Sequence, residues 1–506
     1  MEENKLFDSI KRETNFVKTE NGALAHKTTF SKVYDMFALG GAYRKRSDAD
    51  CILLFKNALA ENEILALKCL FYLRDVRGGQ GERRFFRVCY KWLCETYPEI
   101  AKRNLDEISE YGRYDDILYA IDGTKLEDYA LFLLKEQLEL DLDSTTPSLL
   151  AKWLPSENAS NRTTNRLGNK VRTYLKMTHK QYRQTLAKLR ARINIVERLM
   201  SENRWDEIEF DKIPSKAGLI YKNAFARRDL IAKKYEAFIK DETKTVNARA
   251  LFPYEIVAKA TEHLDWYGRS KTPLDDTDRK AIEKYWNNLP DYLQGTPCKM
   301  LCMCDTSGSM TGSEASAPIN SAIALSMYCA ERISGPWKNH YISFASKPQL
   351  IEIEGVDFVD KVERIYKTNL VDNTNLIAAF DLLLSIARRY NLSQQDMPET
   401  LVVLSDMEID SGTGSWYNDE AEWTAATANT EMEKLRVQWE LAGYKLPKLV
   451  YWNLESRNEN KFLDSGENVT FVSGNSPVLF EQVIKGVTGM DLMLEKLNSK
   501  RYEAIQ

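Results

Sequence analysis

The stretch KMLCMCDTSGSMTG, residues 299–312, decides the fold of the second half of this sequence. A short apolar run over 299–304 predicts a buried strand, and the Gly/Ser turn after it predicts a loop that leads into a helix. Short apolar runs and helical segments alternate from there to the end of the chain. Further strands are expected at 340–345, 349–352, 400–405, 449–453 and 469–473, and helices at 318–333, 358–366, 376–390 and 431–444, with a last helix at the end. Short apolar strands that alternate with helices predict a doubly wound parallel sheet with helices on both faces.

Polar residues follow two of the predicted strands and precede one helix. In a doubly wound sheet such loops meet at the carboxyl edge, where ligands bind. The residues expected to converge there are Asp305, Ser307, Ser309, Thr374 and Asp406. Carboxylate and hydroxyl oxygens suit a hard cation, so we predict a site for Mg²⁺, or for another divalent cation such as Mn²⁺ or Ca²⁺. The alternative is a polar turn in which Ser307 or Ser309 caps a helix.

This site predicts binding and not catalysis. A cation with few charged ligands keeps an open position for a carboxylate or phosphate of a partner, such as an acidic protein. The motifs contain no histidine and no free general base, so an enzyme is not expected.

The first part of the chain, residues 1–294, is expected to be all helical. Apolar residues recur at helical spacing without strands, which indicates a HEAT-like helical-repeat array. The best-defined helix is predicted at 180–200, with Thr178 and Gln181 forming a capping box at its start. The segment NLPDYLQGTP, 288–297, holds two prolines and a glycine, and we place the boundary to the α/β domain, 295–506, within it.

A basic segment lies in this helical part, although the whole chain carries a net charge of −4. Between Arg162 and Arg198 stand eleven basic residues and one acidic residue, Glu197, which favours a polyanionic partner such as RNA. The candidate RNA-binding residues are Arg162, Arg166, Lys170, Arg172, Lys176, Lys180, Arg183, Lys188, Arg190 and Arg192. A solvated helix surface and an acidic protein partner remain alternatives. Tyr182 and Trp205 could stack on bases, but core positions are preferred for both.

A glycine-rich turn, Arg77 to Arg84 (RGGQGERR), invites comparison with a nucleotide-binding loop. It lacks the Lys-Ser/Thr ending of such a loop and follows no predicted strand. We expect a turn between helices that is capped by Glu82, with Arg83, Arg84 and Arg87 exposed.

Composition excludes some classes of protein. No apolar run is long enough for a transmembrane helix, and the N-terminus lacks the apolar region of a secretory signal, so a cytoplasmic protein is expected. The eight cysteines and four histidines show no zinc-ligand spacing, which favours reduced and mostly buried thiols.

Several stretches resemble known families. MCDTSGSM (303–310), DNTNLIAAF (372–380) and VVLSDMEID (402–410) look like the metal-ion-dependent adhesion site of von Willebrand A domains. Residues 19–44, 73–86 and 111–118 are similar to TROVE modules, the helical-repeat RNA-binding ring of the Ro ribonucleoprotein autoantigen. The match extends to uncharacterised TROVE-like proteins that are joined to an A domain.

The resemblance implies that Asp305, Ser307, Ser309, Thr374 and Asp406 take the five positions of the adhesion site. It also implies a Ro-like RNA-binding scaffold that forms part of a ribonucleoprotein. The alternative is a metal-dependent protein-interaction module with the helical array as its platform and no role in RNA binding. The RNA inference rests on fold analogy and charge, which is a weaker basis than site chemistry.

Overall fold

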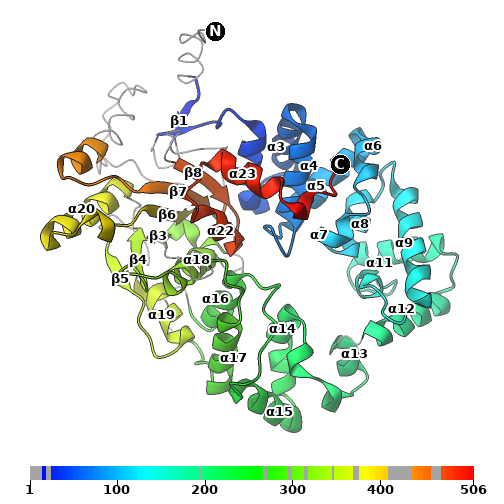
Figure 1. Ribbon diagram of the computed structural model, residues 1–506. Helices are drawn as coiled ribbons and strands as arrows, with labels where there is room; N and C mark the ends of the chain where they lie inside the picture. The colour runs from blue at the N-terminus through cyan, green and yellow to red at the C-terminus, as the bar shows by residue number, and fades with distance from the viewer. Residues whose placement is uncertain are drawn as a thin grey trace. The chain divides into compact units, whose positions relative to one another are not determined.

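The computed structural model describes most of the chain, namely residues 14–18, 24–193, 196–265, 268, 270–293, 299–312, 317–344, 347–368, 375–407, 435–456 and 469–506 (Figure 1). The chain packs into two compact units. One comprises Met1–Arg46 and Leu251–Lys496, and the other comprises Ser47–Ala250 and Leu497–Gln506. We call them the sheet unit and the helical unit.

These limits differ from the division that the sequence suggested between residues 294 and 295. Helix α16 (Pro253–Thr261) packs against α18 (Pro318–Arg332), and α2 (Lys32–Leu39) packs against strand β8 (Val469–Ser473). Both helices therefore belong to the sheet unit, although they precede the expected boundary. The last residues return to the helical unit, where the Arg501 guanidinium binds Asp75 at 2.7 Å. Loop composition marks a change in secondary structure, whereas packing decides which segments form one core.

The sheet unit contains a six-stranded sheet in the order β5-β4-β3-β6-β7-β8. Its strands are β3 (Met300–Asp305), β4 (His340–Phe344), β5 (Leu350–Glu352), β6 (Thr400–Ser405), β7 (Lys448–Asn453) and β8. All neighbouring pairs are parallel except β4 and β5, which are antiparallel, so β5 forms an antiparallel edge. The chain builds outwards from β3 to one side and then returns to build outwards from β6. The predicted α/β architecture is confirmed, but the sheet is mixed and not wholly parallel as predicted. Only residues 345–349 separate β4 from β5, which is too short a connection for a parallel neighbour.

Helices surround this sheet. They are α17 (Asp276–Asn287), α18, α19 (Phe358–Thr368), α20 (Leu376–Tyr390), α22 (Phe480–Val483) and α23 (Gly489–Leu497), with α2 and α16 and the 3-10 helices η1 (Gly40–Lys45), η4 (Gly308–Met310), η5 (Gln394–Asp396) and η6 (Pro477–Leu479). Helix α18 contacts β3, β4 and β6 on one side and α16 on the other, so it is buried from Pro318 to Ala330. Strand β3 is buried throughout, which explains its continuous apolar sequence.

The helical unit is built from helices α3 to α15 and the 3-10 helices η2, η3 and η7 (Figure 1). Their bounds are α3 (Asp48–Glu61), α4 (Glu63–Arg74), α5 (Arg83–Thr96), α6 (Pro98–Arg103), α7 (Ile108–Tyr111), α8 (Tyr114–Ile121), α9 (Glu127–Asp143), α10 (Leu150–Trp153), α11 (Arg162–Tyr174), α12 (His179–Ile193), α13 (Val196–Ser201), η2 (Trp205–Glu207), η3 (Phe210–Lys212), α14 (Ser215–Ala226), α15 (Asp229–Lys240) and η7 (Lys500–Tyr502). Pairs such as α3 with α4 and α5 with α8 pack together, and the predicted helical class is confirmed.

The helix expected at 180–200 is found as α12 and α13, on either side of residues 194–195, which lie outside the described residues. The capping box is present, because Thr178 N donates to Gln181 Oε1 at 2.8 Å and Gln181 N donates to Thr178 Oγ1 at 3.3 Å. Strands β1 (Phe16–Lys18) and β2 (Leu24–His26) form a small antiparallel pair that was not expected. Strands of three residues are too short to give a periodic signal.

Candidate functional site

The ends of strands β3 and β6 carry the predicted cation site. These strands are adjacent and parallel, with Cys304 opposite Leu404, so their carboxyl ends lie side by side. The chain order reverses direction between them, which makes this edge the switch point of the sheet. The parallel register thereby brings the loop that begins at Asp305 next to the one that begins at Ser405.

Asp305 is the centre of the local hydrogen-bond network. Its side chain is buried, with the residue 1% exposed. Its Oδ1 accepts from the backbone N–H of Ser307 at 2.9 Å, and its Oδ2 accepts from Ser405 Oγ at 2.5 Å. The hydroxyls of Ser307 and Ser309 lie 3.0 Å apart. One carboxylate and two hydroxyls therefore share one loop.

The second predicted carboxylate, Asp406, directly follows Ser405 at the end of β6 and is 2% exposed. Met407, the next residue, has a positive φ of 66° and donates its N–H to Ser405 Oγ at 3.1 Å. Ser405 thus accepts one hydrogen bond from its own loop and donates another to Asp305 on the neighbouring strand. This hydroxyl joins the two loops of the site.

Ser405 was not among the predicted site residues. Its signal in the sequence was a small polar residue at the end of an otherwise apolar strand, directly before a candidate ligand. The register extends this polar row, because Ser405 lies opposite Asn453 on β7 and Asn453 lies opposite Ser473 on β8. All three are buried. A single strand pattern cannot show which polar strand ends become neighbours.

The helix-capping alternative is not what the structure contains at this loop. Ser307 occupies the position before the 3-10 helix η4, but its side chain makes no capping hydrogen bond. The remaining predicted ligand, Thr374, lies outside the described residues. Among the residues that the structure describes, no group of three or more His, Cys, Asp or Glu side chains could hold a metal ion. A cation at this edge would therefore need the serine hydroxyls as well as the two carboxylates.

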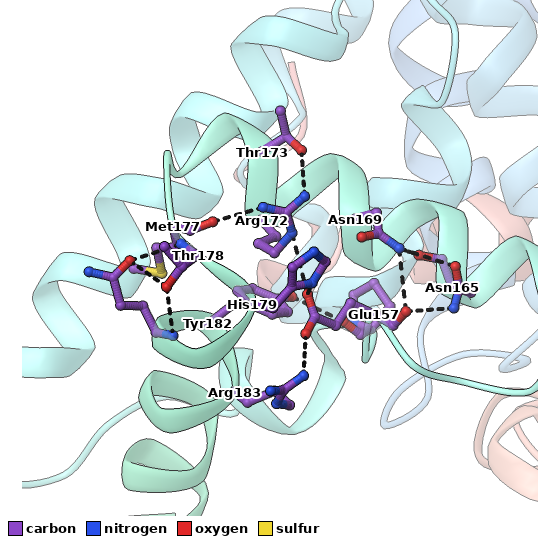
Figure 2. A network of polar contacts seen from close by, with 12 residues as sticks. Glu157, Asn165, Asn169, Arg172, Thr173, Met177, Thr178, His179, Tyr182 and Arg183 are labelled. Carbon is purple, nitrogen blue, oxygen red and sulfur yellow. Dashed lines mark hydrogen bonds and ion pairs between the residues drawn. The ribbon is translucent and has the colours of Figure 1, made fainter.

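The basic segment has a different organisation, centred on Glu157 (Figure 2). The Glu157 side chain is only 3% exposed, and its carboxylate faces Arg172 at 3.3 Å, His179 at 2.6 Å and Arg183 at 3.0 Å. Its backbone carbonyl accepts from the side chains of Asn165 and Asn169. One buried carboxylate in the loop before α11 therefore ties together side chains from α11 and α12.

Four other candidate RNA-binding residues also have partners inside the helical unit. Arg166 and Lys170 both bind Asp122, with Lys170 at 2.7 Å, and the hydrogen bond from Arg166 is the main reason that the pKa of Asp122 is lowered. Arg190 Nε donates to the carbonyl of Ala151 at 2.7 Å, and burial lowers the pKa of Arg190. Arg192 donates to carbonyls at the end of α9, including Leu142 at 2.8 Å.

The other four candidates are exposed, and their side chains make no ion pair or hydrogen bond with any described residue. They are Arg162, Lys176, Lys180 and Lys188. We call them the open cations. The two aromatic residues weighed as stacking platforms are buried: Tyr182 donates to the Pro155 carbonyl at 3.0 Å, and Trp205 is 8% exposed. Their preferred assignment to the core is confirmed.

The glycine-rich turn joins two helices, α4 and α5, as expected. Glu82 caps α5, because its Oε1 accepts from the backbone N–H of Arg84 at 3.1 Å. Arg83 is exposed, but Arg84 is paired with Asp48 and Arg87 is largely enclosed. The prediction of three exposed arginines was therefore right for Arg83 alone.

The remaining expectations concern cysteines and membranes. The seven cysteines within the described residues are free and buried, as predicted, and Cys298 lies outside those residues. No helix in the described part of the chain is long and apolar enough to span a membrane.

Comparisons with known proteins give two family matches. The model described as Domain of unknown function (DUF2828) matches residues 19–117 and 139–296, just over half of the chain. A second, Domain of unknown function (DUF7788), matches residues 299–503. The uncharacterized protein L728 of Acanthamoeba polyphaga mimivirus is 28% identical over 516 residues, covering 93% of this chain and 85% of that protein.

Among solved structures, the crystal structure of the Deinococcus radiodurans RO (RSR) protein aligns over 94% of this chain and 100% of that chain. The sequence identity is 14% and the TM-score is 0.40. A TM-score at this level is too low to establish a shared fold.

Proposed function

We propose that this chain, which belongs to the DUF2828 family, is a non-catalytic binding protein whose sheet unit recognises an acidic partner through a divalent cation. The observation that carries the proposal is the hydrogen bond from Ser405 to Asp305, which joins the two loops bearing the candidate ligands. Asp305, Ser307, Ser309 and Asp406 would hold the cation, and Thr374 completes the predicted set. These are oxygen donors, which suit Mg²⁺, Mn²⁺ or Ca²⁺.

The bound cation would offer an open coordination position to a carboxylate of the partner. The protein side chains prepare this position. Asp305 is held from both sides by the Ser307 N–H and the Ser405 hydroxyl, so its carboxylate is fixed before a cation arrives. The low exposure of Asp305 and Asp406 excludes bulk water from much of the site and strengthens their attraction for a cation.

A titration of the full chain with MgCl₂ and MnCl₂, followed by calorimetry, tests the site. We expect one site that is lost in Asp305→Asn and in Asp406→Asn. Asp381→Asn is the matched control, because Asp381 is an exposed carboxylate of helix α20 in the same unit. Circular dichroism checks that each variant is folded. An unchanged titration in folded Asp305→Asn would overturn the cation site.

The acidic partner is tested with a glutamate-rich peptide, in the presence of Mg²⁺ or of EDTA. We expect binding that EDTA abolishes and that Asp305→Asn lacks. Binding that persists in EDTA would contradict recognition through a cation.

RNA binding by the helical unit is the second candidate function. The open cations favour it, because they can neutralise phosphates without breaking an existing ion pair. The resemblance of three sequence stretches to TROVE modules supports the same test, whereas the family and the mimivirus relative are of unknown function and add no activity.

A gel shift with a structured RNA that has a single-stranded tail, at ~50 and ~200 mM salt and with or without EDTA, tests this candidate. Changing Arg162, Lys176, Lys180 and Lys188 to Gln should weaken binding and reduce the salt slope by about 3, at ~0.7 per phosphate contact on a single strand. The matched control changes four exposed lysines of the sheet unit, Lys271, Lys338, Lys347 and Lys445, to Gln. No shift at ~50 mM salt, or equal losses in the two variants, would contradict RNA binding at this segment.

A further inference from the structure

Two stretches of the sequence whose residues neither proposed function places in its site meet in the helical unit. One is the end of α4 with the glycine-rich turn and the start of α5, and the other is the Tyr111–Leu118 stretch. Helices α5 and α8 pack against each other and bring the two together. The four arginines and two aspartates that meet there are Arg74, Arg83, Arg87, Arg113, Asp115 and Asp116, and we call this set the arginine cluster.

The two aspartates bind three of the four arginines. Asp116, fully buried, accepts from Arg74 Nη2 at 2.6 Å and from Arg87 Nη2 at 2.6 Å. Asp115 accepts from Arg87 at 3.0 Å and from Arg113 Nη2 at 2.5 Å. Burial alone would raise the pKa of Asp116, but Arg74 and Arg87 outweigh it and hold this pKa below its usual range. The Asp116 carboxylate is therefore ionised, and the two carboxylates together bind three guanidinium groups.

The backbone is shaped to allow this arrangement. Gly112 precedes α8, and a Cβ atom at this position would come within 2.6 Å of Asp116 Oδ2 and 3.0 Å of Arg74 Nε. Any side chain there would push the buried pair apart. Two aromatic rings lie against the guanidinium groups of Arg87 and Arg113. Arg87 lies 4.2 Å from the ring centre of Tyr119, and Arg113 lies 3.9 Å from that of Trp153. The arginines are thus held in place and are not free to move apart.

Arg83 is the fourth arginine and has no ion pair or hydrogen bond with any described residue. It lies one helical turn before Arg87 on α5, so both side chains leave the same face of the helix. Desolvation of its guanidinium, and then the positive charges of Arg113 and Arg87, lower the pKa of Arg83. The residue as a whole still keeps contact with solvent. Four positive and two negative side chains leave the arginine cluster with two uncompensated positive charges at a place that solvent can reach.

We propose that the arginine cluster is a binding site for a phosphate group, which Arg83 contacts directly and Arg87 and Arg113 attract. A phosphate dianion would balance the two excess charges. Planar guanidinium groups also match phosphate oxygens with paired hydrogen bonds, which lysines cannot do. The site contains none of the residues of the sheet-edge cation site and none of the open cations. Its test is therefore independent of the tests of both proposed functions.

Calorimetry on the full chain, at constant ionic strength, tests the site with three probes: inorganic phosphate, adenosine 5′-monophosphate, and an oligouridylate that has no terminal phosphate. Arg83→Gln should weaken binding of the recognised probe by about tenfold or more, because one charged hydrogen-bonding partner is lost. Arg227→Gln, which changes an exposed arginine of the same unit that belongs neither to the arginine cluster nor to the open cations, is the matched control and should bind as the wild type does.

Asp115→Asn distinguishes phosphate binding from a purely structural role of the arginine cluster. It removes one of the two compensating charges, so we expect the recognised probe to bind several-fold more tightly, even if the variant is less stable. Recognition of the two monoester probes indicates a free phosphate or a nucleotide, and recognition of the oligouridylate alone indicates a nucleic-acid backbone; either bears out the phosphate site. If no probe binds, or if Arg83→Gln and Arg227→Gln bind alike, the proposal is overturned.

Discussion

The polar residues at the carboxyl edge of the sheet lie close to one another, whereas those of the basic segment do not share one site. At the sheet edge, Asp305 and Ser405 are 100 residues apart in sequence and share a hydrogen bond. In the basic segment, six of the ten candidates go to separate partners: Glu157 binds two arginines, Asp122 binds two more residues, and backbone carbonyls bind Arg190 and Arg192. The other four are the open cations. Convergence in space makes a site, and closeness in sequence does not.

The largest expected effect concerns the hydroxyl that joins the two loops of the sheet edge. Ser405→Ala should lower the affinity for Mg²⁺ by about 10- to 100-fold, because Asp305 loses the group that orients it. Ser405→Thr keeps the hydroxyl and should restore the affinity. Calorimetric titration measures both. If Ser405→Ala changes the thermal stability but not the Mg²⁺ affinity, Ser405 has a structural role and does not position Asp305.

The next effect tests whether the basic segment is held together by buried charge. Glu157→Gln should lower the local free energy of unfolding by about 2 kcal/mol, because a buried carboxylate that faces two arginines and a histidine becomes neutral. Hydrogen exchange of the amides in α11 and α12 measures this. The matched control is Glu202→Gln, an exposed carboxylate that also faces two arginines, which should change exchange far less. Equal changes in the two variants would show that burial of Glu157 gives it no special weight.

A smaller effect, with a defined pH dependence, is expected at Asp122. Its pKa is lowered in the folded state by Arg166, so its contribution is present above the unfolded value of about 3.9 and is lost as the pH falls through the folded value. Asp122→Asn should cost about 1 kcal/mol near pH 7, since Arg166 is half exposed. Urea unfolding at several pH values should show this difference shrinking below pH ~4. A difference that stays constant down to pH ~2 would contradict the ion pair as its cause.

The smallest effect is expected for the open cations. Changing all four to Gln should alter the free energy of unfolding by no more than about 0.5 kcal/mol, because none of them has a partner among the described residues. Urea unfolding of this variant and of Glu157→Gln compares the free energy contributed by the open cations with that contributed by the buried Glu157. A loss as large as that of Glu157→Gln would show that the open cations stabilise the fold as well.

Most features of the carboxyl edge of the sheet could be predicted from the sequence. Apolar strands followed by Asp305 and Asp406 predicted both the strands and the edge at which their ends lie, because parallel strands place every carboxyl end on the same side. Ser405 was missed, since its partner is on another strand and only the register between β3 and β6 makes them neighbours. The arginine cluster was missed for a similar reason, because its two stretches belong to different helices and meet through the packing of α5 on α8.

The helical and α/β classes, the positions of the strands of the six-stranded sheet and the oxygen chemistry of the candidate cation ligands follow from the sequence, since local periodicity and residue chemistry are properties of short segments. The packing of the chain determines which of the basic residues have partners. Arg172, Arg183 and Arg190 have partners within the helical unit, whereas Lys180 and Lys188 are open. Packing also places α2 and α16 in the sheet unit across the expected boundary. The physical reason is that partners, burial and domain limits depend on residues far away in the sequence, and these are brought near only when the chain packs.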